Sequence, residues 1–431
     1  MSKALRKVHY AWILLGAVTM AAAVSSGLRL SFGVILDPLA QEFGWSRGAI
    51  SLAYSISFLA AVPLTFLAGW TGETFGTRRM VMFGSLTVVM GMYLTSRATN
   101  LWQFYVFNGV MVGGLGTALF MTLLPITVTR WFHARLGLAM GIMWTAQSWG
   151  PMLLSPALRW AIETVGWRTS FTVLGFILGG IILAASLFIR NRPEDKGLAP
   201  YGMPVKKQGA AVNVAPIGEG SLNLGQARRT PAFWALIGIH FIGCVSHSIP
   251  LAHIVSMATA AGIGGVAAAG LLSAVSLTSM GSRFGMSLLS EAKGSRLTLG
   301  LSLLLQTTPL LILLWAKDLW VFYLAALLFG IGFGGEMVGF PMFNRQLYGL
   351  AAPLTRIYSY QMVGALTGMA LGGWLGGFLI DLTGGYVWPV LASVITGYAG
   401  LIALLWLPHH RTSATPLLAV PAAAGGGAGV N

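Results

Sequence analysis

Long apolar runs separated by short polar junctions occupy most of the 431-residue chain. An α-helix needs roughly 20 mostly apolar residues to cross the ~30 Å hydrocarbon core of a bilayer, and twelve runs have about that length. Each run is predicted to be a membrane-spanning helix, and the spans are residues 10–36, 48–70, 80–96, 102–128, 136–160, 170–189, 232–256, 266–289, 297–316, 319–343, 357–379 and 387–407. The pattern predicts an all-α membrane protein.

The composition supports this prediction and excludes several classes of protein. Hydrophobic residues make up 56% of the chain and charged residues only 9%, whereas charged residues form about 25% of an ordinary soluble domain. So few charges could not cover the surface of a soluble enzyme of this size. A disordered chain and a secreted disulfide scaffold are also excluded, the latter because Cys244 is the single cysteine.

The basic residues fall mainly on one side of the predicted spans. Twelve crossings place both termini on the same side, where 19 of the 26 Lys and Arg residues lie, against five on the other side and two inside spans. The positive-inside rule makes the terminal side cytoplasmic. We therefore expect a multi-pass protein of the plasma membrane, of the bacterial inner-membrane type, with both termini cytoplasmic. The basic residues that give the net charge of +15 then lie on the cytoplasmic side and contact the lipid bilayer, so the charge does not require a nucleic-acid partner.

The longest polar segment divides the spans into six and six. It runs from about residue 190 to 231 and contains seven Lys or Arg residues together with Pro and Gly, which is typical of a linker. The predicted domains are an N-terminal six-helix bundle (1–190), a cytoplasmic linker (191–231), a C-terminal six-helix bundle (232–408) and a disordered cytoplasmic tail (409–431).

The two halves match each other at three junctions, always at an offset of 218 residues. Parallel six-helix repeats are a transporter architecture, in which the substrate site lies between the halves near the bilayer midplane. The matched pairs, each inside a short local similarity, are Gly44 and Gly262, Glu73 and Glu291, and Glu163 and Asp381.

The junction Gly69–Arg79 resembles the loop signature G-x-x-x-D-x-x-G-R-[RK] of the major facilitator superfamily, with Glu73 at the acidic position. Six further segments are similar to the monocarboxylate transporter and oxalate:formate antiporter branch of that superfamily. The resemblance implies the major facilitator fold, with 12 transmembrane helices in two six-helix bundles. The segments are Phe43–Arg47, Arg130–Gly141, Gly166–Arg168, Arg190–Gly197, Thr230–Trp234 and Asp381–Tyr386.

The loop signature and its repeat are predicted to form a conformational latch. Glycines let a tight turn and neighbouring helices approach closely, and an acid there can cap a helix or pair with arginines across the cytoplasmic mouth. Such pairs would hold the outward-open state. The simpler alternative is a helix–turn–helix with solvated charges. The predicted latch residues are Gly69, Glu73, Gly76, Arg78, Arg135, Glu291 and Arg296.

Three charged residues fall inside predicted spans, namely Arg29, Arg283 and Glu336. An ionisable residue inside a span is costly and is a functional candidate by default. The branch that the chain resembles carries an arginine at the position of Arg283, which implies that Arg283 binds the substrate carboxylate. A guanidinium suits this role because it offers a bidentate fork. The alternative is a structural ion pair between Arg283 and Glu336.

Glu336 is predicted to couple the proton to the substrate. Related transporters often keep an aspartate one turn before the arginine of the eighth span, and that position is Ser279 here. We hypothesise that Glu336 supplies the missing acid from the neighbouring helix and that its protonation frees Arg283 for the substrate anion. A static Arg–Glu strut is the alternative.

Several other polar residues are candidates for substrate binding. Arg29 could snorkel outward, pair with Asp37, or form a second cationic contact that favours dicarboxylates. Each of the remaining candidates could instead be a packing residue that hydrogen-bonds another helix. We predict no metal site, because no carboxylate or cysteine cluster accompanies the histidines in the sequence, and no cofactor. The remaining candidates are Gln147, Gln361, Asn108 and His247.

The leading prediction is a secondary active transporter of small organic anions, most simply a monomer that moves a monocarboxylate with a proton by alternating access. The alternative is organic anion exchange of the oxalate:formate type, although residues 357–379 lack the lysine that those antiporters carry in this span. A channel or a membrane-embedded enzyme is a remote alternative. Neither the polar rings of a pore nor clustered nucleophiles and bases are visible, so no catalytic activity is expected.

Overall fold

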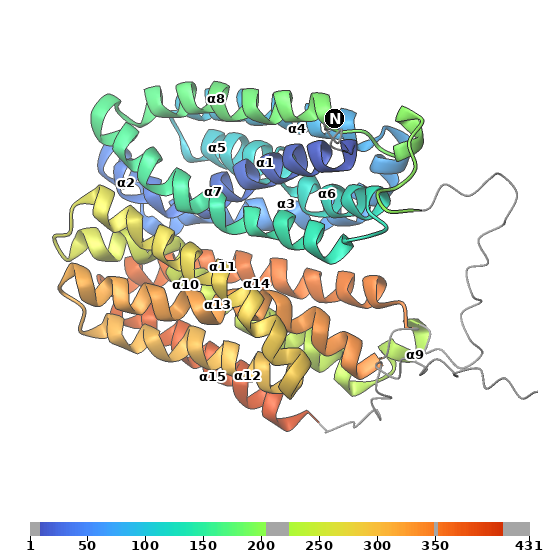
Figure 1. The fold of residues 1–431 in the computed structure, drawn as a ribbon. Coiled ribbons are helices and arrows are strands. Elements are labelled where there is room, and N and C mark those ends of the chain that lie inside the picture. The colour runs from blue at the N-terminus through green and yellow to red at the C-terminus, as the bar shows by residue number, and fades with distance from the viewer. Residues whose placement is uncertain (1–8, 204–223, 349–351, 408–431) are drawn as a thin grey trace, which may run out of the picture.

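The computed structural model describes residues 9–203, 224–348 and 352–407. These residues are almost entirely helical, and their one β-bridge joins Phe132 and Tyr201 (Figure 1). The centre of the predicted linker and the predicted tail (409–431) lie outside the described residues.

Twelve helical segments correspond to the twelve predicted spans, which confirms the all-α prediction. The N-terminal six are α1 (Tyr10–Leu30), α3 (Arg47–Thr74), α4 (Thr77–Ser96), the composite α5–η2–α6 (Leu101–Phe104, Tyr105–Leu115, Ala118–Trp131), α7 (Leu136–Val165) and α8 (Trp167–Phe188). The C-terminal six are α10 (Pro231–Ala260), α11 (Gly265–Lys293), α12 with η4 (Ser295–Thr307, Thr308–Leu314), α13 (Leu319–Tyr348), α14 (Leu354–Thr383) and α15 (Val387–Trp406). Short connecting elements are η1 (Phe32–Ile35), α2 (Leu36–Phe43), η3 (Pro193–Lys196) and α9 (Leu224–Arg228).

Three spans differ from the predicted regular helices, and one of them is the ninth, which ends in the 3₁₀-helix η4. The first span was expected to reach residue 36, but α1 ends at Leu30, and a turn follows that brings Gly33 against the backbone of Ala252 in α10. The fourth span contains the π-helix η2, closed by a bond from the Gly116 N–H to the Met111 carbonyl (2.7 Å). Nine of the described helices are long and apolar enough on their own to cross a membrane.

The helices form two groups of six, visible in Figure 1 as a blue-to-green group and a yellow-to-red group. The predicted 218-residue repeat is visible in the element bounds: α7 and α14 each have 30 residues and begin 218 positions apart, as do α4 and α12. Within the groups, α1 packs on α7 and α10 on α14. The prediction of two six-helix bundles is therefore confirmed.

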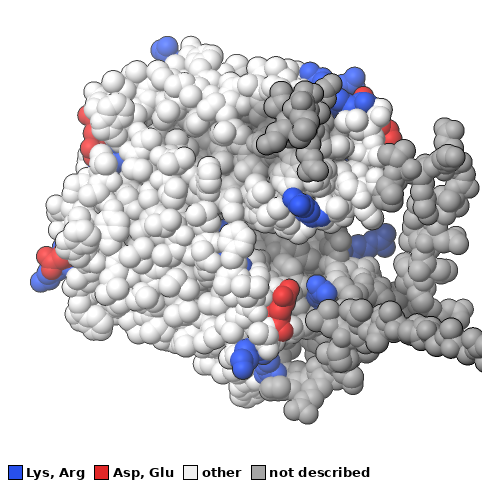
Figure 2. All heavy atoms as spheres, in the orientation of Figure 1, with Lys and Arg blue, Asp and Glu red and all other residues white. Residues whose placement is uncertain are grey.

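The outer surface is suited to a bilayer. Most charged side chains on the face in Figure 2 lie toward the two ends of the helices, and a broad uncharged band separates them. Tryptophans at both ends, Trp102, Trp315, Trp320 and Trp406, are at least 75% exposed. Aromatic residues are enriched where a membrane meets water, so these side chains mark the two interfaces.

We call the end of the molecule that carries the linker the linker end, and the other end the opposite end. The two bundles are joined at the opposite end. The Asp381 carboxylate at the end of α14 accepts hydrogen bonds from the backbone N–H groups of Arg47 (2.9 Å) and Gly48 (2.6 Å). These are the first residues of α3, so an acid of the C-terminal bundle neutralises the positive helix terminus of the N-terminal bundle.

The repeat places a second acid in an equivalent position. Glu163, the counterpart of Asp381, pairs with Arg159 (2.8 Å), and both side chains lie directly against Gly265, the first residue of α11. A Cβ atom on Gly265 would overlap both side chains, which would then have to move away. Both crossings of the bundles at the opposite end therefore bring an acid of one bundle to a helix N-terminus of the other.

Asp37 adds a third contact at the opposite end. Its carboxylate binds the guanidinium of Arg47 (3.1 Å) and accepts a hydrogen bond from the Thr259 hydroxyl in α10 (2.6 Å). Tyr386, which precedes α15, lies near Arg47 and Asp37, and burial raises its pKa to about 12. At physiological pH, Tyr386 therefore contributes a neutral hydroxyl to the contacts that join the bundles at the opposite end.

Hydrogen bonds between the bundles continue to the middle of the spans. The Ser55 hydroxyl donates to the Ala370 carbonyl (2.5 Å), and the Ser273 hydroxyl donates to the Met152 carbonyl (2.6 Å). These bonds join α3 to α14 and α7 to α11. The bundles are thus held together from the opposite end inward.

Close packing of α1 on α7 depends on Gly150, because a Cβ atom there would overlap the Ala23 carbonyl oxygen. We expect Gly150→Ala to destabilise the protein by about 1–3 kcal/mol through overpacking. The apparent melting temperature of the detergent-purified protein should fall by several degrees. Gly180→Ala in α8 is the matched control, since its Cβ would have nothing within 4 Å. Equal melting temperatures for the two variants would contradict this account.

The hydrogen bonds of Asp381 to α3 lead to a prediction about how often the opposite end opens. Asp381→Ala removes the acceptor for two α3 N–H groups, so the opposite end should open more often. We would measure this as the maleimide labelling rate of Ser51→Cys, a buried α3 position beside Gly377, in a Cys244→Ala background. Charge-assisted hydrogen bonds of about 1.5–3 kcal/mol imply at least a tenfold faster rate.

The control for this experiment is Asp318→Ala, because Asp318 is an exposed acid at the same end. Its removal should leave the labelling rate of Ser51→Cys unchanged. If Asp381→Ala and Asp318→Ala gave the same rate, Asp381 would not hold the closure.

Candidate functional site

Arg29 is buried inside the N-terminal bundle, in the last turn of α1, and is 7% exposed. Its Nη2 donates to the Thr117 hydroxyl (3.1 Å), its Nη1 contacts the Met121 Sδ (2.8 Å), and its guanidinium lies 5.3 Å from the centre of the Phe58 ring. The Nε has no hydrogen-bond partner among the described residues. The predicted pair with Asp37 is absent, since Asp37 binds Arg47 instead.

Arg283 lies where the two bundles meet. Its Nη1 donates to the backbone carbonyl of Trp144 in α7 (2.6 Å), so a cation of the C-terminal bundle reaches the N-terminal bundle. The side chain is half-buried, and its Nε has no hydrogen-bond partner in the described parts of the chain. Among the ion pairs of the described residues, none includes Arg29 or Arg283.

A small cavity lies between the bundles, and residues that are near both arginines in the chain line it. Its wall includes Leu30, the neighbour of Arg29, and Ser279, one turn before Arg283. Gln147 also lines the cavity, as predicted for a residue facing the centre, and so does Ser148. The hydroxyls of Ser148 and Ser279 have no partner among the described residues, so they can still hydrogen-bond a polar guest.

Glu336 binds His247 rather than Arg283. The distance from the His247 Nδ1 to the Glu336 Oε2 is 2.9 Å, and both side chains are fully buried. The expected Arg283–Glu336 pair is therefore not formed in this structure. The two residues have similar depth along neighbouring helices, but Glu336 faces α10 and Arg283 faces α7. The second nitrogen of His247, Nε2, contacts the Met369 Sδ (3.0 Å).

The other predicted substrate contacts differ in their surroundings. Gln361 and Asn344 form a reciprocal amide pair with two bonds of 2.8 Å, buried inside the C-terminal bundle. His247 is engaged by Glu336, and Asn108 is half-buried on the π-helix η2. Gln147 alone of these four lines the cavity between the bundles. Gln361 and His247 therefore have structural partners in this conformation.

The predicted latch residues lie at the linker end. Gly76 precedes α4 with φ of +82°, and a Cβ atom there would overlap Asn191, whose Oδ1 accepts the Arg78 backbone N–H (3.5 Å). Arg135 precedes α7 in the left-handed conformation (φ +58°).

The remaining latch residues give one contact with known geometry. Arg296 donates to the Leu405 carbonyl (2.6 Å), and Glu291 is exposed. Gly69 and Glu73 lie in α3, but their surroundings are outside the described side chains. The predicted ion-pair latch around Glu73 therefore stays a prediction.

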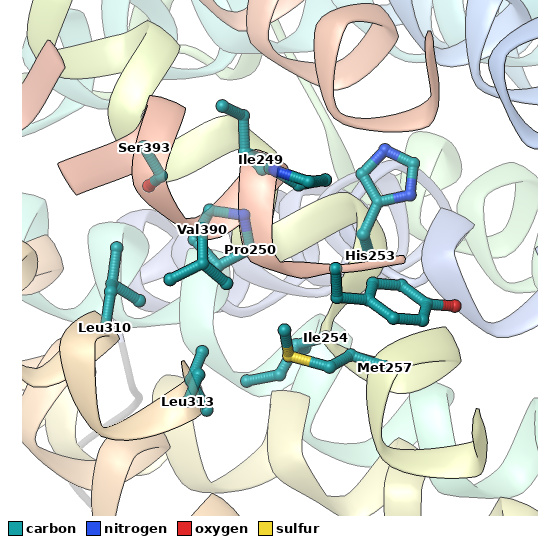
Figure 3. Close-up of a pocket in the computed structure, with 11 residues that line it drawn as sticks. Ile249, Pro250, His253, Ile254, Met257, Leu310, Leu313, Val390 and Ser393 are labelled. Atoms are coloured by element: carbon teal, nitrogen blue, oxygen red, sulfur yellow. The ribbon is translucent and has the colours of Figure 1, made fainter. Parts of the chain in front are cut away.

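A second cavity, of about 300 Å³, lies inside the C-terminal bundle between α10, η4 and α15. Figure 3 shows Ile249, Leu310, Leu313 and Val390 around Pro250. Its wall is almost entirely apolar, so it lacks the cations that an organic anion requires.

One cluster was missed by the sequence analysis. The expectation of no metal site rested on the absence of a cysteine or carboxylate beside the histidines, whereas the structure brings Cys244 and Glu336 to His240. The ligand atoms of these three residues lie within 4.8 Å of one another. His240 and Cys244 are four residues apart in the sequence, a spacing that places both on one helix face.

Known proteins similar to this chain are transporters. It is 26% identical to the uncharacterized MFS-type transporter YcxA of Bacillus subtilis (92% of this chain, 94% of YcxA) and 25% identical to human monocarboxylate transporter 11 (94% and 85%). It is also 25% identical to the oxalate:formate antiporter of Oxalobacter formigenes, over 58% of this chain and 57% of that protein. These relatives confirm the resemblance to this branch.

A solved structure shows the same fold. It is a bacterial homologue of the human lysosomal transporter Spinster in an inward-facing, occupied conformation, with a TM-score of 0.66, 16% sequence identity, and coverage of 92% of this chain and 95% of that one. The family model of the Major Facilitator Superfamily matches residues 13–353. With twelve spans in two repeated bundles, this chain belongs to the major facilitator superfamily of membrane transporters.

Proposed function

We propose that this transporter moves small organic anions, most simply a monocarboxylate together with a proton, by alternating access. The observation that carries the proposal is a pair of arginines, one in each bundle, that have no carboxylate partner among the described residues and lie within one helical turn in the chain of residues lining the central cavity. A cation inside a bilayer is costly unless it is neutralised. A carboxylate substrate supplies the missing negative charge.

The geometry favours a small substrate. The cavity is small, which favours an anion of few carbon atoms, and its unpartnered hydroxyls can bind oxygen atoms of the guest. We assign Arg283 as the main anchor, because it spans both bundles through the Trp144 carbonyl. An anion bound there would touch elements that move relative to each other. Arg29 and Gln147 are the second contacts from the N-terminal bundle.

Glu336 is the proposed proton carrier, with His247 as its hydrogen-bond partner. The original hypothesis, in which Glu336 releases Arg283 directly, is replaced by an indirect route, because the carboxylate faces His247. The helices carrying the two sites are in close contact: the Ser282 hydroxyl of α11 donates to the Ile331 carbonyl of α13. A change at Glu336 therefore reaches α11 through helix packing.

The charge distribution sets the proposed orientation. With the linker end cytoplasmic, as the positive-inside rule requires, the closed opposite end faces outward and the structure is inward-facing. The proposal also includes a plasma-membrane location and function as a monomer. In this orientation, the predicted latch residues would pair when the transporter turns outward.

Organic anion exchange is the second candidate. Two arginines without a carboxylate partner among the described residues lie within one helical turn in the chain of residues lining the cavity, which also suits a divalent anion exchanged for a monovalent one. Dependence of uptake on an anion on the other side of the membrane, without any effect of a pH gradient, would favour exchange.

The anchor assignment predicts the effect of Arg283 variants in proteoliposomes. Arg283→Ala should lower uptake of labelled lactate, pyruvate, formate or oxalate about 10- to 100-fold, from the loss of about 1.5–3 kcal/mol of charge-assisted hydrogen bonding. Arg283→Lys should be intermediate, because it keeps the charge but not the fork. Arg97→Ala, an exposed arginine at the opposite end, is the control. Unchanged transport of every anion by Arg283→Ala would refute the assignment.

The proton assignment predicts a separate effect for Glu336→Gln. This variant should still exchange internal for external labelled anion, but a gradient acidic on the uptake side should no longer accelerate uptake. Glu194→Gln, an exposed acid at the linker end, should keep the pH response. Full gradient-driven uptake by Glu336→Gln would remove Glu336 from the mechanism while leaving anion transport in place.

A further inference from the structure

Three metal-ligating side chains meet in the interior of the C-terminal bundle. His240 and Cys244 lie one turn apart on α10, and Glu336 approaches them from α13. Their exposed fractions are 1%, 0% and 0%. One ligand atom from each lies within 4.8 Å of the other two.

Two possible ligand atoms of the cluster have no hydrogen-bond partner among the described residues, which suggests that they bind a ligand. The His240 Nδ1 and the Glu336 Oε1 have no hydrogen-bond partner in the described chain, although both residues are buried. An unpaired buried polar group costs about 1–3 kcal/mol, so native proteins rarely leave two of them side by side. The glycine at position 243 helps to create the site, since a Cβ atom there would lie 2.6 Å from the Glu336 Oε1.

We propose that His240, Cys244 and Glu336 form a binding site for one divalent transition-metal ion of the Zn²⁺ class. Imidazole nitrogen, thiolate sulfur and carboxylate oxygen are the ligands that Zn²⁺ takes, whereas Mg²⁺ and Ca²⁺ require oxygen ligands. The thiol loses its proton when the metal binds.

The charges and distances fit such an ion. A thiolate and a carboxylate balance a charge of +2, and His240 binds as neutral imidazole, so the loaded site is electrically neutral inside the membrane. A tetrahedral ion with bonds of about 2.0–2.3 Å holds its ligands about 3.3–3.7 Å apart. The three atoms, now within 4.8 Å, need to close by at most about 1.5 Å. The fourth position is left for water.

The site is positioned to control transport. One oxygen of Glu336, Oε2, already binds His247, and the metal would use the other, Oε1. The ion would join α10 to α13 through these three side chains, so it acts as an inhibitor of uptake that requires the two helices to move. This effect rests on the proposed transport by alternating access, whereas metal binding itself does not.

Binding is tested with the full-length, tag-free protein in detergent, stripped of metal by a chelator. Cd²⁺ serves as the probe because its bond to a thiolate gives an ultraviolet charge-transfer band. We expect one Cd²⁺ per chain with this band, its displacement by Zn²⁺, and no effect of excess Mg²⁺. Cys244→Ala should lose the band, and His240→Gln should weaken Cd²⁺ affinity at least tenfold. His133→Gln, an exposed histidine, is the control and should bind as the unmodified protein does.

A transport measurement separates the two proposals. Zn²⁺ should inhibit proton-driven uptake by the unmodified protein in proteoliposomes, and Cys244→Ala should keep its uptake but become insensitive to Zn²⁺. Absence of the thiolate band, or Cd²⁺ binding unchanged in both Cys244→Ala and His240→Gln, would overturn the metal site. Stoichiometric Cd²⁺ binding by a protein that moves no organic anion would instead refute the proposed function and leave the metal site standing.

Discussion

A charge placed inside a hydrocarbon core must find a partner, and this constraint explains the arrangement of the interior. Glu336 meets it within the protein by binding His247. Arg29 and Arg283 contact only neutral groups among the described residues: a hydroxyl, a sulfur and an aromatic ring for Arg29, and a carbonyl for Arg283. Each bundle thus holds one arginine without a carboxylate partner in its described part, and a bound anion would supply the missing negative charge.

The internal repeat places an acid at both crossings of the bundles. In each bundle, the acid near the end of the fifth span reaches the beginning of the second span of the other bundle, Asp381 at α3 and Glu163 at α11. Helix N-termini favour negative charge, and Asp381 meets this preference directly by accepting two N–H groups of α3. Glu163 pairs with Arg159 beside Gly265, so the two crossings share a position in the repeat but differ in their contacts.

Sequence patterns predicted the elements better than the contacts between them. The spans follow from the length of apolar runs, and the 218-residue offset reappears in the bounds of α7 and α14. Depth along a helix did not reveal which way Arg283 and Glu336 face, since a small rotation about the axis changes the partner. The Gln361–Asn344 pair and the approach of Glu336 to Cys244 likewise depend on how separate helices pack. Periodicity within one helix carries no such information.

The proposed separation of the proton and anion sites would have a mechanical consequence. His247 is on α10, and the same helix carries Ala252, whose backbone meets Gly33, and Thr259, whose hydroxyl binds Asp37. A proton on Glu336 would replace a charged hydrogen-bond acceptor by a neutral one and weaken the bond that ties α10 to α13. Through Thr259, the loosened helix is one of those that hold the opposite end closed. Protonation of Glu336 would therefore weaken the contacts of the opposite end through α10. A bound substrate would act through Arg283 and α7. Both effects change the contacts between the two bundles.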